Sequence, residues 1–145
     1  MNALKIYLAE DDGDDIMFFK EALEQCSNSC SLTVCENGKD LLSDLSGSRN
    51  TLPTIIFLDI NMPVMDGFSA LQKIKSEPEL KDIHVIMLTT SASAFTIDKA
   101  FELGASLFVK KPYSMQDLQN MIERVLQINW NEKTPPVTKS DFIYK

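Results

Sequence analysis

Near-continuous apolar runs alternate along the chain with segments whose apolar residues recur at helical spacing. In the segment 14–26, for example, Ile16, Phe19 and Leu23 fall on one face of a helix. The runs predict strands at 4–9, 32–35, 54–58, 84–88 and 106–109. The amphipathic segments predict helices at 14–26, 37–45, 66–76, 92–103 and 114–129. Three of the strands are almost wholly apolar, which is typical of parallel strands covered on both faces.

Strict alternation of strand and helix predicts an α/β fold, because parallel strands need crossover connections and right-handed crossovers can cover both faces of a sheet. We expect a doubly wound (βα)5 domain over residues 1–130, with a five-stranded parallel sheet in the flavodoxin-like order 2-1-3-4-5. Residues 131–145 are too few for a second domain and form a predicted C-terminal tail. Its apolar end, Phe142-Ile143-Tyr144, could bind a partner or exchange between two copies, but terminal disorder is the favoured prediction.

Composition narrows the class of protein further. The 145 residues are 44% hydrophobic and 24% charged, as in a soluble globular domain. The formal charge of −7 argues against nucleic acid as a partner. No apolar run approaches a membrane span, and no signal peptide is visible, so a cytoplasmic location is expected. The three cysteines are odd in number and lack a CxxC spacing, which favours free thiols, and the single histidine, His84, is predicted to be structural.

Charged and polar residues follow four of the predicted strands. Glu10 and Asp11 follow the first strand, Asp59 the third, Thr89 ends the fourth and Lys111 follows the fifth. The first and third strands are neighbours in the expected order, so the three carboxylates converge at the carboxyl edge of the sheet. Repulsion between them favours a divalent cation such as Mg²⁺, and a lysine and a hydroxyl beside them suit a phosphoryl group. Asp59 is then a natural nucleophile.

These residues carry a resemblance to the receiver domain of two-component response regulators, the CheY-like family. It spans about residues 3–130, and five matches in order at family-like spacing make it specific. The matching segments are Glu10-Asp11, Leu58-Asp59-Ile60-Asn61-Met62-Pro63, Asp66-Gly67, Leu88-Thr89-Thr90 and Val109-Lys110-Lys111-Pro112.

The resemblance implies a chemical role for the acidic residues. Asp59 accepts a phosphoryl group from a histidine of a sensor kinase or phosphotransfer protein. Mg²⁺, or Mn²⁺ in its place, is held by the carboxylates of Asp11 and Asp59, by the backbone carbonyl of Asn61 and by Glu10 through water. Asp12 also follows the first strand, but its offset from the strand favours Glu10 and Asp11 as the acidic pair.

The resemblance also implies a conformational switch. Lys111 pairs with the phosphoryl oxygens, Thr89 moves toward them, and Phe108 is the aromatic residue that follows Thr89 inward. The proline assigns the lysine role to Lys111 rather than to Lys110, and strand alternation points Lys110 the other way. The Lys111–Pro112 peptide bond is usually cis in the family.

The expected function is that of a single-domain response regulator, a phosphoacceptor rather than an enzyme, whose only catalysis is its own phosphorylation and dephosphorylation. It would signal to a downstream protein, as a monomer or as a phosphorylation-dependent homodimer. The expected output surface is the face around 94–103, Phe108 and the last helix; passing the phosphoryl group onward is the alternative output. Met17 and Phe18 lie off the apolar face of their helix and predict a docking patch for the phosphodonor.

Three other functions stay open at this point. An aspartyl-phosphate phosphatase is disfavoured, since such enzymes commonly carry an aspartate two residues after the nucleophile, where this chain has Asn61. A flavodoxin-like cofactor binder needs a phosphate-cradling loop after the first strand, but that loop is acidic here. An interaction domain that is never phosphorylated would leave the site residues without a purpose.

Overall fold

The computed structural model describes residues 4–26, 30–48, 50–132, 136 and 138–144. Its sheet has five parallel strands in the order β2-β1-β3-β4-β5, which confirms the predicted fold class and strand order. Every predicted helix and strand is present, with boundaries that agree within three residues. The strands are β1 (Leu4–Ala9), β2 (Cys30–Cys35), β3 (Ile55–Leu58), β4 (His84–Thr89) and β5 (Leu107–Lys110).

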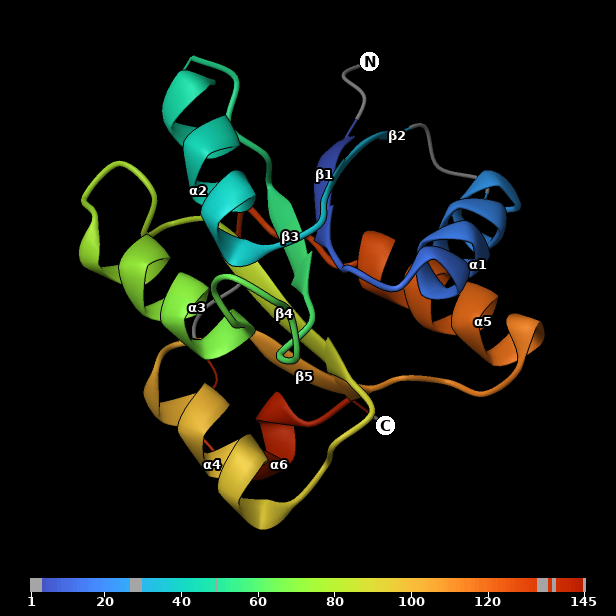
Figure 1. Ribbon diagram of the computed structural model, residues 1–145. Coiled ribbons are helices and arrows are strands. Elements are labelled where there is room, and N and C mark those ends of the chain that lie inside the picture. The colour runs from blue at the N-terminus through green and yellow to red at the C-terminus, as the bar shows by residue number, and fades with distance from the viewer. Residues whose placement is uncertain (1–3, 27–29, 49, 133–135, 137, 145) are drawn as a thin grey trace.

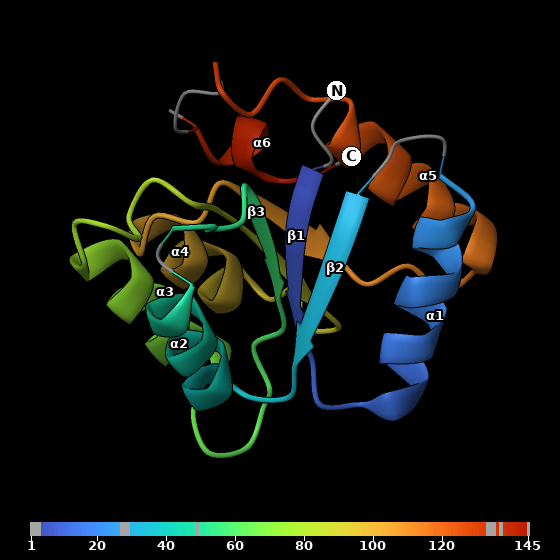
Figure 2. The same ribbon diagram turned by 90° about the horizontal axis from the view of Figure 1, so that it is seen from above.

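Five helices cover the two faces of this sheet (Figures 1 and 2). Helices α1 (Gly13–Glu24) and α5 (Met115–Leu126) lie on one face, and α2 (Gly38–Gly47), α3 (Gly67–Ser76) and α4 (Ala94–Glu102) lie on the other. Strand side chains alternate between the two faces, so the core has two layers. Ile6, Leu8 and Phe57 pack under α1 and α5, whereas Tyr7 and Ile56 belong to the opposite layer.

Side-chain caps fix where the helices begin. Asp12, Asn37, Asp66, Ser93 and Ser114 each accept hydrogen bonds from backbone N–H groups in the first turn of the following helix. Such caps satisfy donors that have no partner inside the helix and are worth about 1 kcal/mol each. All five helices therefore begin at the carboxyl edge of the sheet, beside the strand ends that carry the predicted site.

The C-terminal segment differs from the expectation of a disordered tail. Residues Lys139–Phe142 form a short helix, α6, beside α4 (Figure 1), and Phe142 is fully buried. Ile143 then forms a parallel bridge with Phe108 on the outer edge of β5. The reason is hydrophobic burial, since covering one phenylalanine side chain contributes about 1.5–3 kcal/mol. The remainder of the predicted tail, 133–135, 137 and 145, lies outside the described residues.

Candidate functional site

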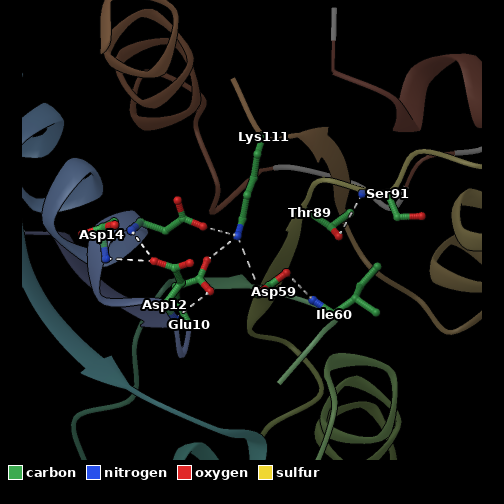
Figure 3. A network of polar contacts seen from close by, with 9 residues as sticks. Glu10, Asp12, Asp14, Asp59, Ile60, Thr89, Ser91 and Lys111 are labelled. Atoms are coloured by element: carbon green, nitrogen blue, oxygen red, sulfur yellow. Dashed lines mark hydrogen bonds and ion pairs between the residues drawn. The ribbon is translucent and has the colours of Figure 1, made fainter. Parts of the chain in front are cut away.

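The acidic residues that follow β1 and β3 meet at the carboxyl edge of the sheet (Figure 3). These strands pair in parallel, with Ala9 opposite Leu58, and the Asp59 N–H donates to the Ala9 carbonyl at 3.0 Å. The pairing therefore holds Glu10 and Asp59 side by side. Both are buried, with exposed fractions of 2% and 6%, whereas Asp11 next to them is exposed.

Lys111 reaches into this acidic group from the end of β5. Its Nζ lies 2.5 Å from Glu10 Oε1, 2.8 Å from Asp15 Oδ2 and 3.5 Å from Asp59 Oδ2. The backbone N–H of Lys111 donates to the Thr89 carbonyl at 2.8 Å, which fixes the lysine beside the end of β4. The structure thus brings together Glu10, Asp59, Thr89 and Lys111 as the sequence predicted.

The burial of these charges perturbs their ionisation. Desolvation is the main cause that raises the pKa of Glu10 to about 7, and the charge of Asp59 adds to it, while Lys111 opposes it. Burial alone would lower the pKa of Lys111, but its hydrogen bonds to Asp15 and Glu10 raise it above its usual value. Lys111 is therefore charged at neutral pH, and one ammonium group faces several carboxylates.

The acidic group has the geometry of a cation site. One carboxylate oxygen from each of Glu10, Asp11 and Asp59 lies within 4.8 Å of the others, so these three residues could hold a divalent metal ion. Carboxylate oxygens are the ligands that hard cations such as Mg²⁺ prefer. Asn61, whose backbone carbonyl the resemblance assigns to the metal, is exposed at the start of the loop that follows.

Two acidic residues near the site have roles that the sequence alone did not assign. Asp12 Oδ1 accepts from the N–H groups of Asp14 and Asp15 at 2.9 and 3.2 Å, so Asp12 caps α1 (Figure 3). Asp15, in the first turn of α1, binds Lys111. The only signal for Asp15 was its place in a run of acids, since the pairing joins residues far apart in sequence.

The loop from β3 to α3 (59–66) and the first residue of α3 hold the nucleophile in place. Asp59 Oδ1 accepts from the Ile60 N–H at 2.8 Å, which leaves Oδ2 facing Lys111. Asp66 caps α3 through the Ser69 N–H at 2.8 Å, as its sequence position suggested. Gly67 does more than allow a turn: a Cβ atom there would lie 2.2 Å from the Asp59 carbonyl oxygen. Only glycine permits this close approach of two backbone segments.

The two residues of the predicted switch are both buried. Thr89 is fully buried, and its Oγ1 accepts from the Ser91 N–H at 3.3 Å. Phe108 is 1% exposed, and its ring packs against Phe142 with a centroid distance of 6.1 Å. The aromatic ring that the resemblance expects to move inward is thus already inward in this structure.

The end of β5 shows which of two adjacent lysines enters the site and which isomer the following proline bond adopts. Lys110 is exposed and points away from the site toward the Tyr113 ring, so Lys111 is the lysine that enters the acidic group. Among the described residues no peptide bond is cis, so the expected cis Lys111–Pro112 bond is wrong for this structure. The two isomers of a bond before proline differ by only about 0.5–1 kcal/mol, so local sequence does not fix the choice.

An apolar surface lies beside the charged site. Met17 and Phe18 on α1 are 68% and 53% exposed, as predicted. Phe18 also lines a pocket of about 110 Å³ that Glu10, Lys111 and the exposed Tyr113 border. A side chain from a partner protein placed in this pocket would lie next to Lys111.

Comparisons with known proteins agree with the fold. The chain belongs to the response regulator receiver domain family, whose model matches residues 6–123. Receiver domains are signalling domains of two-component systems, which act with histidine kinases or phosphotransfer proteins and with downstream targets. No helix in the described part of the chain is both long enough and apolar enough to cross a membrane.

Individual relatives share most of their length with this chain. Response regulator Rcp1 of Synechocystis sp. (strain ATCC 27184 / PCC 6803 / Kazusa) is 29% identical over 124 residues, which cover 83% of this chain and 84% of Rcp1. The Mn²⁺-bound structure of Rcp1 superposes with a TM-score of 0.77 at 28% identity, covering 92% of this chain and 99% of that one. The structure of the phosphorylated cyanobacterial phytochrome response regulator RcpA superposes with a TM-score of 0.81 at 27% identity. This match covers 94% of this chain and 100% of that one.

Proposed function

We propose that this receiver domain accepts a phosphoryl group on Asp59 from a histidine of a sensor kinase or phosphotransfer protein. The observation that carries the proposal is the position of Asp59: its Oδ2 is 3.5 Å from Lys111 Nζ, at a sheet edge shared with Glu10 and Asp11. A buried carboxylate nucleophile, a cation for the transferred oxygens and a potential metal site are the groups that phosphoryl transfer to aspartate requires.

The transfer forms one bond and breaks one. A carboxylate oxygen of Asp59 attacks phosphorus, and the bond from phosphorus to the donor histidine nitrogen breaks. The nitrogen keeps the electron pair of that bond. In the later hydrolysis, the oxygen of a water molecule attacks phosphorus, and the bond from phosphorus to the Asp59 oxygen breaks. Inorganic phosphate leaves with the proton of the water, and the Asp59 carboxylate is restored. The domain would catalyse these steps on itself only.

Each site residue has a defined task in this scheme. The Lys111 ammonium, which binds Glu10 and Asp15, would also bind the new phosphoryl oxygens. The Thr89 hydroxyl, whose oxygen accepts from the Ser91 N–H, would donate its own proton to a phosphoryl oxygen. Electrostatic stabilisation of this kind is the main contribution that a protein makes to phosphoryl transfer. Phe108, which pairs with Met87 two residues before Thr89, would be the aromatic residue of the switch.

The acidic residues would hold Mg²⁺, or Mn²⁺ in its place. Asp11 and Asp59 would bind it through carboxylates, Asn61 through its backbone carbonyl and Glu10 through water. When bound, the ion neutralises the clustered carboxylates and the incoming phosphoryl oxygens. The Mn²⁺-bound state of Rcp1 and the phosphorylated state of RcpA support this assignment.

We further propose that the domain signals through protein–protein contact in the cytoplasm. The net charge of −7 supports a protein rather than a nucleic acid as its partner. The three free cysteines are in keeping with a reducing compartment.

The test is the intact mass of the protein after incubation with acetyl phosphate, with Mg²⁺ and with EDTA. We expect one phosphoryl adduct on the wild type with Mg²⁺, and none with EDTA or in Asp59→Asn. Asp66→Asn is the matched control, because Asp66 is an acidic residue of the same loop. Its side chain caps α3, and it is not among the acids that pair with Lys111 in the described structure. An adduct on Asp59→Asn equal to that on the wild type contradicts the proposal, as does an unmodified wild type with both acetyl phosphate and a phosphohistidine donor.

A further inference from the structure

The C-terminal segment 138–144, called the tail segment below, is attached to the outer edge of β5. Thr138 caps α6 through the Asp141 N–H, Ile143 bridges Phe108, and the Tyr144 N–H donates to the Phe108 carbonyl at 2.8 Å. Without this segment that edge of β5 would expose unpaired backbone groups. The tail segment thus extends the sheet beyond β5 in a parallel sense.

Side chains of the tail segment contact two helices, α4 and α5. Phe142 is fully buried against Phe101 of α4, with ring centroids 5.3 Å apart and an edge-to-face angle of 64°. Lys139 forms an ion pair of 2.7 Å with Asp98 of α4. The Tyr144 ring lies 5.3 Å from the Arg124 guanidinium of α5. The face formed by α4, β5 and α5, the expected output surface, is therefore occupied in part by the chain itself (Figure 1).

The strand that holds the tail segment also holds the phosphoryl site. Phe108 lies three residues before Lys111 on the same extended segment, and it pairs with Met87 of β4. Thr89 pairs with Lys110 in the same register. A shift of the Phe108 ring or backbone is therefore transmitted along β5 to Lys111 and across the pairing to Thr89.

The tail segment holds the Phe108 ring in the inward position that the resemblance assigns to the phosphorylated state. The Phe108 ring is already buried without a phosphoryl group, and Phe142 covers it. If the tail segment left, Phe142 would vacate this space, and the ring could rotate outward to fill it. Tail docking and phosphorylation hence favour the same position of the same ring.

We propose that the tail segment is an intramolecular activator of the receiver: its docking on β5 promotes phosphorylation of Asp59, and phosphorylation tightens its docking. This inference rests on the proposed function and concerns the regulation of that site. Phe142 acts as a positioning residue, since it contacts Phe108 and not the reacting atoms. A downstream partner then meets a surface that includes α6, rather than a bare β5 edge.

Coupling between two sites is reciprocal, so the inference can be tested from both ends. The first measurement is the initial rate of phosphorylation by acetyl phosphate and Mg²⁺ in full-length variants. We expect Phe142→Ala to lower this rate about fivefold or more. Phe142→Leu, which refills most of the space, should stay close to the wild type. Leu45→Ala is the matched control: it also empties a fully buried position, but on α2, away from the tail segment.

The second measurement is amide hydrogen exchange of Tyr144, whose N–H bonds to Phe108. Exchange should slow when wild type is phosphorylated and stay unchanged when Asp59→Asn receives the same treatment. Equal phosphorylation rates in wild type and Phe142→Ala overturn the inference but leave the proposed function intact, and so does faster Tyr144 exchange after phosphorylation. An equal loss of rate in Leu45→Ala also overturns it, because general destabilisation would then be the cause. A wild type that takes no phosphoryl group overturns both.

Discussion

At the scale of single residues, the site is defined by contacts between groups that no local rule connects. Lys111 is bound by Glu10, Asp15 and Asp59 at once, and Gly67 lies against the backbone of Asp59. Both features set the position of the nucleophile relative to its neighbouring charge. Each can be altered by one substitution.

Gly67→Ala tests the close approach of α3 to Asp59. A Cβ atom 2.2 Å from the Asp59 carbonyl oxygen forces the backbone apart, so we expect a loss of about 1–3 kcal/mol in the free energy of unfolding. Phosphorylation by acetyl phosphate should be largely lost as Asp59 is displaced. Gly47→Ala makes the same change in α2 where nothing lies within 4 Å, and should stabilise by about 0.5–1 kcal/mol. Urea unfolding measures both, and shifts of the same sign would contradict this reading.

Asp15→Asn tests whether Asp15 competes with the phosphoryl group for Lys111. Removing one of three carboxylates frees Lys111 Nζ to engage incoming oxygens, so we expect a phosphorylation rate that rises by about two- to fivefold. Asp14→Asn removes the same charge one residue earlier, and the ion pairs that Lys111 makes with described residues are with Glu10, Asp15 and Asp59 instead. Initial rates with acetyl phosphate measure the effect. An equal rise in both variants would trace it to overall charge instead.

At the scale of elements, the loop between β3 and α3 carries backbone strain close to the site. Val64 has φ of +68°, in the left-handed region, and it sits in a tight turn where the Met65 N–H donates to the Pro63 carbonyl at 2.7 Å. A β-branched residue rarely adopts this conformation. The turn is buttressed by Gly38, whose N–H donates to the Met65 carbonyl at 3.0 Å. The neighbouring α2 thereby helps to hold the loop of the nucleophile.

Val64→Gly should relieve this strain. We expect a gain of about 1 kcal/mol in the free energy of unfolding, because relief of left-handed strain exceeds the added entropy of the unfolded chain. Little hydrophobic burial is lost, since Val64 is 76% exposed. Val64→Thr keeps the β-branch and should leave stability unchanged. Urea unfolding decides the matter, and identical midpoints for the glycine and threonine variants would rule out strain as the cause.

At the scale of the whole molecule, the charged site has an apolar border on one side and the tail segment on the other. The exposed side chains of Phe18 and Tyr113 line the pocket next to Lys111, on the side of α1 and α5. The exposed Met17 precedes Phe18 on α1. Phe142 and α6 lie beyond β5, next to α4. The predicted docking patch on α1 and the tail segment thus lie on different sides of one small sheet.

Phe18→Ala separates donor docking from chemistry. We expect phosphotransfer from the cognate histidine donor to slow by about tenfold, since an interface aromatic in a pocket is worth more than about 1 kcal/mol. Phosphorylation by acetyl phosphate, which needs no docking surface, should be unchanged. Phe95→Ala is the matched control, an exposed phenylalanine on α4. A full rate of transfer from the cognate donor to Phe18→Ala would show that docking occurs elsewhere.

The sequence by itself determined the order of the elements and the edge at which the chemistry lies. Apolar periodicity is a local property, so five strands and five helices could be located from it. The crossover rule limited the possible strand orders, and the flavodoxin-like order was the best guess among them. Since parallel strands end together, Glu10, Asp59, Thr89 and Lys111 could be predicted to meet. The same local patterns could not predict which distant residues a charged side chain or the C-terminal segment would contact.

Only the tertiary structure decided the contacts that depend on packing between distant elements. Lys111 meets Asp15 across 96 residues of sequence, the α3 backbone approaches Asp59 so closely that only Gly67 fits, and Phe142 finds a buried place on Phe108. Each of these contacts depends on which charges remain unpaired and which apolar surfaces remain exposed after the sheet and helices have assembled. Burial free energy selects such contacts from many alternatives, and it has no signature in the periodicity of the segments that make them.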